Sequence, residues 1–200
     1  MAQIIIAVGR EFGSGGHEIA SRLADRLDIP MYDRNMLDHM AEKNGLDAER
    51  LNQYDEGKRF PLKRTVRGHS SSVVDNFAQI QFDFLKEKAE SGESFVIVGR
   101  CGEYVLRKYP GLVSVFIRGE ESKKIERVKT LYKLSAEEAK QKMVRHDKKR
   151  KAYHNTYSDI KWGDSRGYDL LVNSSKLGVD ATTDYVEDFV RKYIEELEQK

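Results

Sequence analysis

Ile4-Ile5-Ile6-Ala7-Val8 is an apolar run, and it leads directly into Gly9-Arg10-Glu11-Phe12-Gly13-Ser14-Gly15-Gly16-His17-Glu18. A helical pattern of apolar residues follows, up to Leu27. A strand, a glycine-rich turn and a helix in this order are typical of a phosphate-binding loop, because the N–H groups at the helix start point at the anion. We therefore predict an α/β nucleotide-binding fold. The predicted phosphate-binding residues are Gly13, Ser14, Gly15, Gly16, His17 and Glu18.

The loop lacks the lysine that the pattern G-x-x-x-x-G-K-[ST] places after its last glycine. Another cation must then offset the charge of the bound phosphates. Arg10 is always charged and has a forked set of donors. His17 would supply charge only when protonated, which an adjacent phosphate favours. We keep both as candidates, and either could instead be an exposed loop residue.

The composition is that of one folded domain. The chain has 200 residues, of which 39% are hydrophobic and 34% charged. The net charge of +2 gives no overall attraction to nucleic acid. Cys101 is the single cysteine, which excludes an internal disulfide and a cysteine zinc site and favours a reducing, cytoplasmic setting. We predict no signal peptide, no membrane partner and no metal-ligand cluster.

Further apolar runs predict strands at residues 95–98, 112–117 and 169–173, and a weaker strand at 31–33. Helical patterns cover residues 18–27, 34–43, 73–90, 120–131 and 180–197, and a capping box at Ser135 opens another helix. Almost wholly apolar strands indicate a parallel sheet covered on both faces. We predict one domain over residues 1–200, with an insert at about 45–72 and a lid at about 134–167 that would exclude water from a transfer reaction.

Val98-Gly99-Arg100-Cys101-Gly102 lies at the end of a predicted strand, where ligands bind in open α/β sheets. Arg100 suits a monophosphate or a carboxylate, because a guanidinium binds such groups through two hydrogen bonds. The alternative is a salt bridge to a neighbouring helix. We expect Cys101 to be a packing residue rather than a nucleophile.

The basic run from Arg145 to Lys151 has three interpretations. It is a solvated helix face, a cover whose arginines stabilise the charge of a transferring phosphoryl group, or a nucleic-acid-binding cluster, which the near-balanced overall charge disfavours. Asp147 and Arg150 share one helix face. Asp33, after Tyr32, could accept a hydrogen bond from the acceptor or cap a helix. Nearby polar and aromatic residues could pack under the cover or stack on a base: Tyr153, His154, Asn155, Tyr157 and Trp162.

Taken together, these motifs resemble the cytidylate kinase-like proteins, relatives of the nucleoside monophosphate kinases in the P-loop superfamily. The resemblance covers nearly the whole chain and also includes the stretch from Leu171 to Gly178. It implies a three-layer fold with a five-stranded parallel sheet, an insert and a lid. It further implies transfer of the ATP γ-phosphoryl group to CMP or dCMP with Mg²⁺. Arg100 matches an arginine on the monophosphate side, and Asp147 and Arg150 match the lid's acidic–basic pattern.

The loop departs from that family pattern. Gly16 stands at the lysine position, and His17 and Glu18 replace a glycine and a threonine. We predict a nucleotide kinase with small nucleotide substrates; the alternatives are a non-catalytic nucleotide-binding protein on the same fold and a nucleic-acid-binding protein. The predicted catalytic residues are Arg10, His17, Arg145 and Arg150, and the predicted acceptor-binding residues are Asp33, Arg100 and Asp147. The last helix carries an apolar stripe that covers the sheet or pairs with a second copy of the chain: Tyr185, Phe189, Tyr193 and Leu197.

Overall fold

Five parallel strands form the central sheet, in the order β2-β5-β1-β6-β7. A computed structural model describes residues 2–35, 65–66, 69–70 and 73–199. The strands of the sheet are β1 (Ile5–Arg10), β2 (Met31–Tyr32), β5 (Phe95–Val98), β6 (Leu112–Arg118) and β7 (Leu170–Asn173). All five predicted strands are confirmed, and every pairing between them is parallel.

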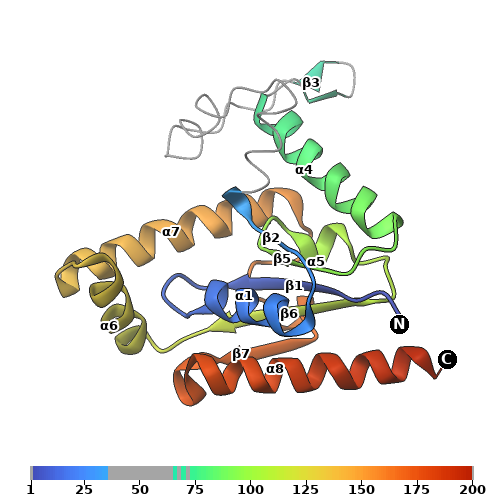
Figure 1. Ribbon diagram of the computed structural model, residues 1–200. Coiled ribbons are helices and arrows are strands. Elements are labelled where there is room, and N and C mark those ends of the chain that lie inside the picture. Colours follow the sequence, from blue (N-terminus) through green and yellow to red (C-terminus); the bar gives the residue numbers. More distant parts are fainter. Residues whose placement is uncertain (1, 36–64, 67–68, 71–72, 200) are drawn as a thin grey trace.

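Helices cover both faces of this sheet, which gives three layers (Figure 1). The helices are α1 (Gly16–Leu27), α4 (Val73–Glu90), α5 (Gly102–Val105), α6 (Glu121–Tyr132), α7 (Ala136–Tyr157) and α8 (Ser174–Glu198). Alternate residues of a strand point to opposite faces. Ile6 and Val8 therefore pack with α1 and α8, whereas Ile5 and Ala7 pack toward Leu85 of α4. The three-layer fold with a five-stranded parallel sheet is as predicted.

Most helix bounds follow the sequence signals. The capping box is present, because Ser135 Oγ accepts from the Glu138 N–H and the Glu138 carboxylate accepts from the Ser135 N–H at 2.8 Å. The predicted helix 34–43 begins at residues 34–35, and its remainder lies outside the described residues. The predicted insert also lies mostly outside them, apart from the hairpin of β3 (Thr65–Val66) and β4 (His69–Ser70).

The predicted apolar stripe of the last helix is wrong in part. Tyr185 is 52% exposed, whereas Val186 and Val190 are fully buried. The buried face runs instead through Thr182, Thr183, Val186 and Val190, in a helix that begins at Ser174 and is broken at Gly178, where φ is 78°. Phe189 and Tyr193 do pack at the edge of the core, so this helix covers the sheet.

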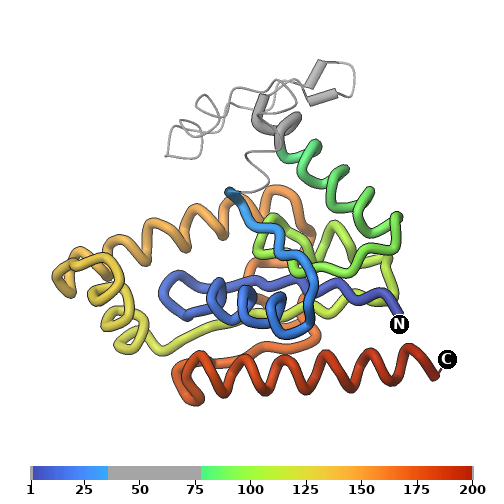
Figure 2. Tube along the Cα trace, viewed as in Figure 1, coloured from blue at the N-terminus to red at the C-terminus, as the bar shows by residue number. Residues whose placement is uncertain are grey.

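The chain begins and ends on the same side of the molecule (Figure 2). There the backbone N–H of Ala2 donates to the carboxylate of Glu198 at 3.1 Å. At the other side, α6 and α7 lie beside the turn between β1 and α1 (Figure 1), and α7 makes up most of the segment 134–167 that we predicted as a lid. None of the helices in the described ranges is both long and apolar enough to cross a membrane.

Candidate active site

The turn between β1 and α1 is built as an anion-binding loop. Gly13 and Gly15 have φ of 85° and 80°, a left-handed conformation that glycine adopts without strain. Ser14 is buried, and its hydroxyl donates to the Glu11 carbonyl at 2.9 Å. The first N–H groups of α1 have no acceptor within the helix. They and the helix dipole therefore favour a phosphate at this position.

Arg10 takes the space beside the loop that a lysine at position 16 would need. A Cβ on Gly16 would lie 2.5 Å from the Arg10 Cβ, and a Cβ on Gly99 would overlap the Arg10 Nη1. Both glycines therefore make room for this one side chain. In this backbone geometry any side chain at position 16 would meet the Cβ of residue 10, so only glycine fits there and a lysine is excluded.

The Arg10 guanidinium is a confined cation. Its Nε is buried and has no hydrogen-bond partner among the described residues. Burial, followed by the nearby charges of Arg150 and Arg100, lowers the pKa of Arg10 to about 9. It remains charged at neutral pH, and a bound anion would relieve the repulsion among the three arginines.

The neighbouring loop side chains are already engaged. His17 is exposed at its side chain and lies 3.1 Å from Asp33 Oδ2. Glu18 forms ion pairs with Arg127 and, at 2.7 Å, with Arg22. The hydrogen bond from Arg127 is the main cause that lowers the pKa of Glu18 against the effect of burial. Glu18 can therefore contribute its backbone to a phosphate site, whereas its carboxylate belongs to this ion-pair network.

The lid helix α7 is fastened to the loop. Asp147 Oδ1 accepts the backbone N–H of Phe12 at 2.7 Å, and Arg150 donates to the Arg10 carbonyl at 3.2 Å. The His146 ring stacks on Phe12 with 4.3 Å between ring centroids. Burial is the main cause that raises the pKa of Asp147 and lowers that of His146 to about 4, so the imidazole is neutral at pH 7. Asp147, predicted as an acceptor-binding residue, contacts the loop.

Arg100 stands on a strained turn. Gly99, Arg100 and Cys101 have φ of 78°, 55° and 54° in succession, and two of these three left-handed residues are not glycine. Such strain clusters at functional sites. The turn places the Arg100 guanidinium over the Tyr153 ring, 4.9 Å from its centroid. Burial raises the pKa of the Cys101 thiol, which fits the predicted packing role.

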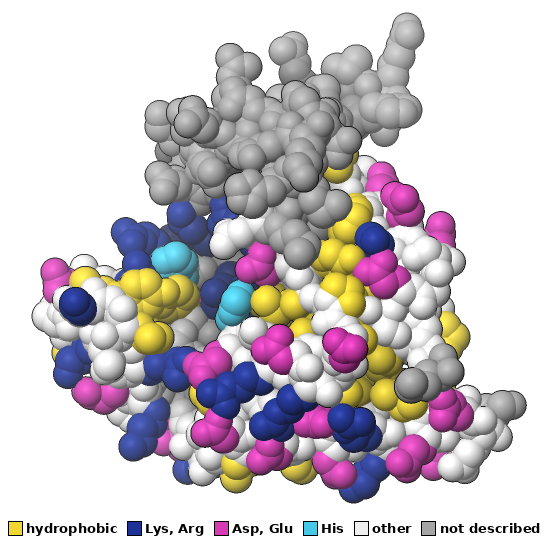
Figure 3. All heavy atoms as spheres, in the orientation of Figure 1, with side chains coloured by type: hydrophobic (Ala, Val, Ile, Leu, Met, Phe, Trp, Pro, Cys, Tyr) yellow, Lys and Arg dark blue, Asp and Glu magenta, His cyan; other side chains and the backbone are white. Residues whose placement is uncertain are grey.

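A cavity of about 150 Å³ lies at the carboxyl ends of β1 and β5. Its cationic lining consists of Arg10, Arg34, Arg100, Lys149 and Arg150. Its other polar and aromatic side chains include Glu103, His146, Tyr153, His154, Trp162 and Tyr168. In Figure 3 the surface beside the lid is hollowed, and Lys and Arg side chains gather around it. Among the predicted site residues, Arg145, which is exposed, His17 and Asp33 do not line this cavity.

The aromatic residues after the basic run pack inside the protein. Trp162 lies edge-on to Phe116 at 5.3 Å between centroids, and Tyr157 lies edge-on to Phe82 at 5.4 Å. This packing favours the first of the two predicted roles for these residues. Tyr153 and Trp162 also form part of the cavity wall, so they are placed to contact a ligand there.

A larger cavity, of about 410 Å³, lies over the first half of β6. Its polar groups pair with one another: Asp169 Oδ2 accepts from both the N–H and the hydroxyl of Ser114, and Tyr193 donates to the Pro110 carbonyl at 2.8 Å. It shares Glu103, His154 and Tyr168 with the smaller cavity, but its lining includes no residue from the carboxyl ends of β1 and β5, where α/β sheets bind their ligands. The smaller, cationic cavity is therefore the candidate active site.

The acidic residues beside the loop do not form a protein-held Mg²⁺ site. Glu11 is paired with Lys124 at 2.8 Å, Glu18 with two arginines, and Asp147 with the Phe12 amide. Within the described ranges, no group of three His, Cys, Asp or Glu side chains is placed to hold a metal ion. Magnesium in kinases is typically held by substrate phosphates and water with one or two carboxylates.

Comparison with known proteins supports these observations. The model of the cytidylate kinase-like family matches residues 5–176. The crystal structure of an uncharacterized protein from Eubacterium ventriosum ATCC 27560 is 38% identical, covers 94% of this chain and 99% of its own, and has a TM-score of 0.77. Two kinases share the fold. Shikimate kinase from Bacteroides thetaiotaomicron is 15% identical, with 95% of this chain and 99% of its own covered and a TM-score of 0.57. A gluconokinase from Sinorhizobium meliloti 1021 is 17% identical, with 97% of this chain and 95% of its own covered and a TM-score of 0.57. No curated protein sequence matches the chain.

Proposed function

The chain belongs to the cytidylate kinase-like family, and from that premise we propose that it transfers the γ-phosphoryl group of ATP to a nucleoside monophosphate, with CMP and dCMP as the first candidates. One observation carries the proposal: Arg10, Arg100 and Arg150 converge on a single cavity beside the phosphate loop. Catalysis of phosphoryl transfer consists mainly of positioning and of stabilising charge. Converging guanidinium groups supply both.

On the donor side, the backbone N–H groups from Gly13 to His17 hold the ATP phosphates. Arg10 provides the positive charge that the loop lysine provides elsewhere. Its confinement between Gly16 and Gly99 supports this role over the alternative, His17, because the His17 side chain is 55% exposed and turned to Asp33.

On the acceptor side, Arg100 binds the acceptor phosphate. Its strained turn and its place in the cavity support this role. A phosphate oxygen of the acceptor forms a new bond to the γ-phosphorus while the bond to the leaving ADP oxygen breaks. Arg150 stabilises the charge on the transferring group, and Asp147 keeps the lid helix that carries Arg150 against the loop. The closed lid excludes water, which would otherwise compete with the acceptor.

A coupled assay of ADP release tests this proposal. ATP and Mg²⁺ are supplied with a panel of nucleoside monophosphates, and calorimetry measures ATP binding in parallel. Turnover with one or more monophosphates supports the kinase. ATP binding without turnover on any acceptor would favour a non-catalytic nucleotide-binding protein. The missing lysine and the ion-paired Glu18 support that alternative. No ATP binding would contradict both.

A further inference from the structure

Helix α6 packs directly against the phosphate loop. A Cβ on Gly13 would lie 2.9 Å from Val128 Cγ2 and 3.1 Å from Lys124 Cβ, so this helix touches the loop without a gap. A Cβ on Gly15 would lie 3.7 Å from the Arg127 Cζ. Because Lys124 and Arg127 are three residues apart, they share one face of α6. The helix therefore presents one cation beside each of the two left-handed glycines.

Each of these cations is paired with a carboxylate that flanks the loop. Lys124 Nζ donates to Glu11 Oε2 at 2.8 Å, and the Lys124 side chain is only 11% exposed. Arg127 forms an ion pair with Glu18, which also accepts from Arg22 at 2.7 Å. Glu11 precedes the loop glycines and Glu18 follows them. Helix α6 thus holds the loop at both of its ends.

Glu11 also anchors the loop through its backbone. Its N–H donates to the Ile117 carbonyl at 3.0 Å, and its own carbonyl accepts the Ser14 hydroxyl at 2.9 Å. Besides the bond from Lys124, the Glu11 carboxylate accepts the backbone N–H of Gly119, just after β6, at 3.0 Å. This one residue therefore ties the loop to both β6 and α6.

A phosphate loop of this composition needs support from outside its own sequence. Glycine loses more conformational freedom on ordering than any other residue, and the loop lacks the lysine of the usual pattern. A site that is already held in its bound conformation binds more tightly, because binding then orders less of the chain. A bare carboxylate near the phosphates would repel them. Glu11 and Glu18 can therefore support the loop only when each is paired with a cation.

We propose that Glu11 and Glu18 are positioning residues, which hold the phosphate loop in the conformation that binds the donor phosphates. Lys124 and Arg127 fasten them to α6 and neutralise their charge. The inference rests on the proposed function and names the residues that shape its donor site. The alternative is that the two cations contact ATP themselves, and that the carboxylates only pair with them in the free protein. Rescue experiments distinguish the two.

Amide hydrogen exchange of the free protein tests the positioning role without a nucleotide. Glu11→Ala removes the acceptor of the Gly119 N–H and of Lys124, so we expect amides in the peptide 9–18 to exchange at least about tenfold faster. Glu11→Gln keeps an acceptor for Gly119 and should show a smaller increase. The peptide that covers β5 should exchange as in the wild type. Unchanged exchange in the loop would overturn the inference.

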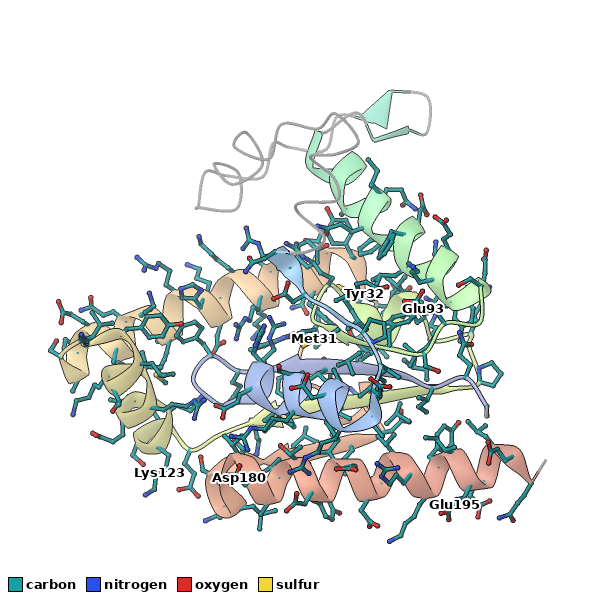
Figure 4. All side chains as sticks on the ribbon, in the orientation of Figure 1. Met31, Tyr32, Glu93, Lys123, Asp180 and Glu195 are labelled. Carbon is teal, nitrogen blue, oxygen red and sulfur yellow. The ribbon has the colours of Figure 1, made fainter. Side chains whose placement is uncertain are left out.

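Calorimetry of ATP binding then measures the consequence for the donor site. Lys124→Met keeps the length of the side chain but leaves the Glu11 carboxylate without its cation, so we expect the Kd for ATP to rise at least about fivefold. Lys123→Met is the matched control, because Lys123 has the same charge on the same helix but is exposed and points away from the loop (Figure 4). It should change the Kd less than twofold. Equal effects of the two variants would overturn the inference.

Double variants separate positioning from direct contact with ATP. If Lys124 acts by neutralising Glu11, Lys124→Met with Glu11→Gln should bind ATP at least about threefold more tightly than Lys124→Met alone, because the unpaired carboxylate is gone. Arg127→Met should be rescued by Glu18→Gln in the same way. Losses that persist in full in both double variants assign the cations to ATP itself and overturn the inference. Thermal unfolding checks each fold, and if Glu11→Ala does not fold, these variants decide.

The inference and the proposed function can fail separately. Turnover of a monophosphate together with unchanged loop exchange and no rescue overturns the positioning role alone. ATP binding without turnover, with faster loop exchange in Glu11→Ala and rescue in the double variants, contradicts the transfer reaction while supporting the positioning role. A wild-type protein that binds no ATP overturns both.

Discussion

The backbone N–H of Phe12 donates to Asp147 Oδ1 at 2.7 Å, which joins the phosphate loop to a lid helix 135 residues further along the chain. The same helix stacks His146 on the Phe12 ring and points Arg150 at the Arg10 carbonyl. The loop conformation and the position of the lid are therefore coupled. A change at this contact should affect both the stability of the fold and the transfer reaction.

Asp147→Ala should lower both the free energy of unfolding and the rate of phosphoryl transfer. The Phe12 N–H is partly buried, and leaving it without an acceptor costs about 1–3 kcal/mol of unfolding free energy. For a chain of 200 residues, thermal unfolding should shift downward by about 2–4 °C for each kcal/mol. We expect kcat to fall as well, because Arg150 loses its positioning partner. Asp147→Asn keeps an acceptor oxygen and should recover most of the stability; an unaltered Tm in Asp147→Ala would contradict the coupling.

Arg10→Gln should weaken ATP binding without destabilising the protein. Loss of a charge-assisted contact to phosphate costs about 1.5–3 kcal/mol, or about 10- to 100-fold in Kd. In the free protein, however, the Arg10 cation is unfavourably buried beside two other arginines. Removing it should leave the free energy of unfolding in urea unchanged or higher. His17→Ala, at the other candidate residue, should change ATP affinity less than threefold; the reverse order would assign the lysine's role to His17.

Local signals in the sequence predicted much of this site. The strand, the glycine turn and the helix start from residue 4 onward are contiguous, and Arg100 follows a buried strand, so short-range patterns sufficed for both. The family resemblance supplied the rest of the layer arrangement. The glycine loop and the Arg100 turn depend on residues that are close together in the sequence, so the sequence alone predicts them.

Contacts between distant residues could not be predicted in this way. The sequence around Gly16 does not indicate that the Arg10 side chain packs against it and against Gly99. The position of that side chain depends on how β1 and β5 pair. Glu103 in α5 and His154 in α7 are 51 residues apart in the sequence and meet only through the tertiary fold. Asp147 belongs to a highly charged helix, so the sequence gives no signal that this one carboxylate contacts a loop amide.

His146 should make the fold sensitive to mild acid. Its pKa is about 4 in the folded protein against 6.5 ordinarily, so the unfolded chain binds more protons between these values. The stabilisation is fully present above pH 6.5 and is lost as the pH falls toward 4. His146→Phe keeps the stacking on Phe12 and removes the titration. Urea unfolding at pH 7 and pH 4.5 should show a smaller loss for the variant; an equal loss would place the acid sensitivity elsewhere.

Arg100→Ala should act on the acceptor alone. The guanidinium lies in the cavity over Tyr153, and the phosphate loop is built without it. Removing one bidentate contact to the acceptor phosphate should raise the acceptor KM by about 10- to 100-fold or abolish transfer. The calorimetric Kd for ATP should change less than threefold. Because alanine at a φ of 55° relieves no strain and adds none, the Tm should change little.

Arg145→Ala is the control for that experiment. Arg145 lies on the same lid helix as Arg150 and carries the same charge as Arg100, but it is exposed and outside the cavity lining. Its removal alters the net charge equally and should leave the acceptor KM within about twofold. If the two variants raise KM to the same extent, the arginines act through the general field of the basic lid. Unchanged kinetics in Arg100→Ala would remove Arg100 from the acceptor site altogether.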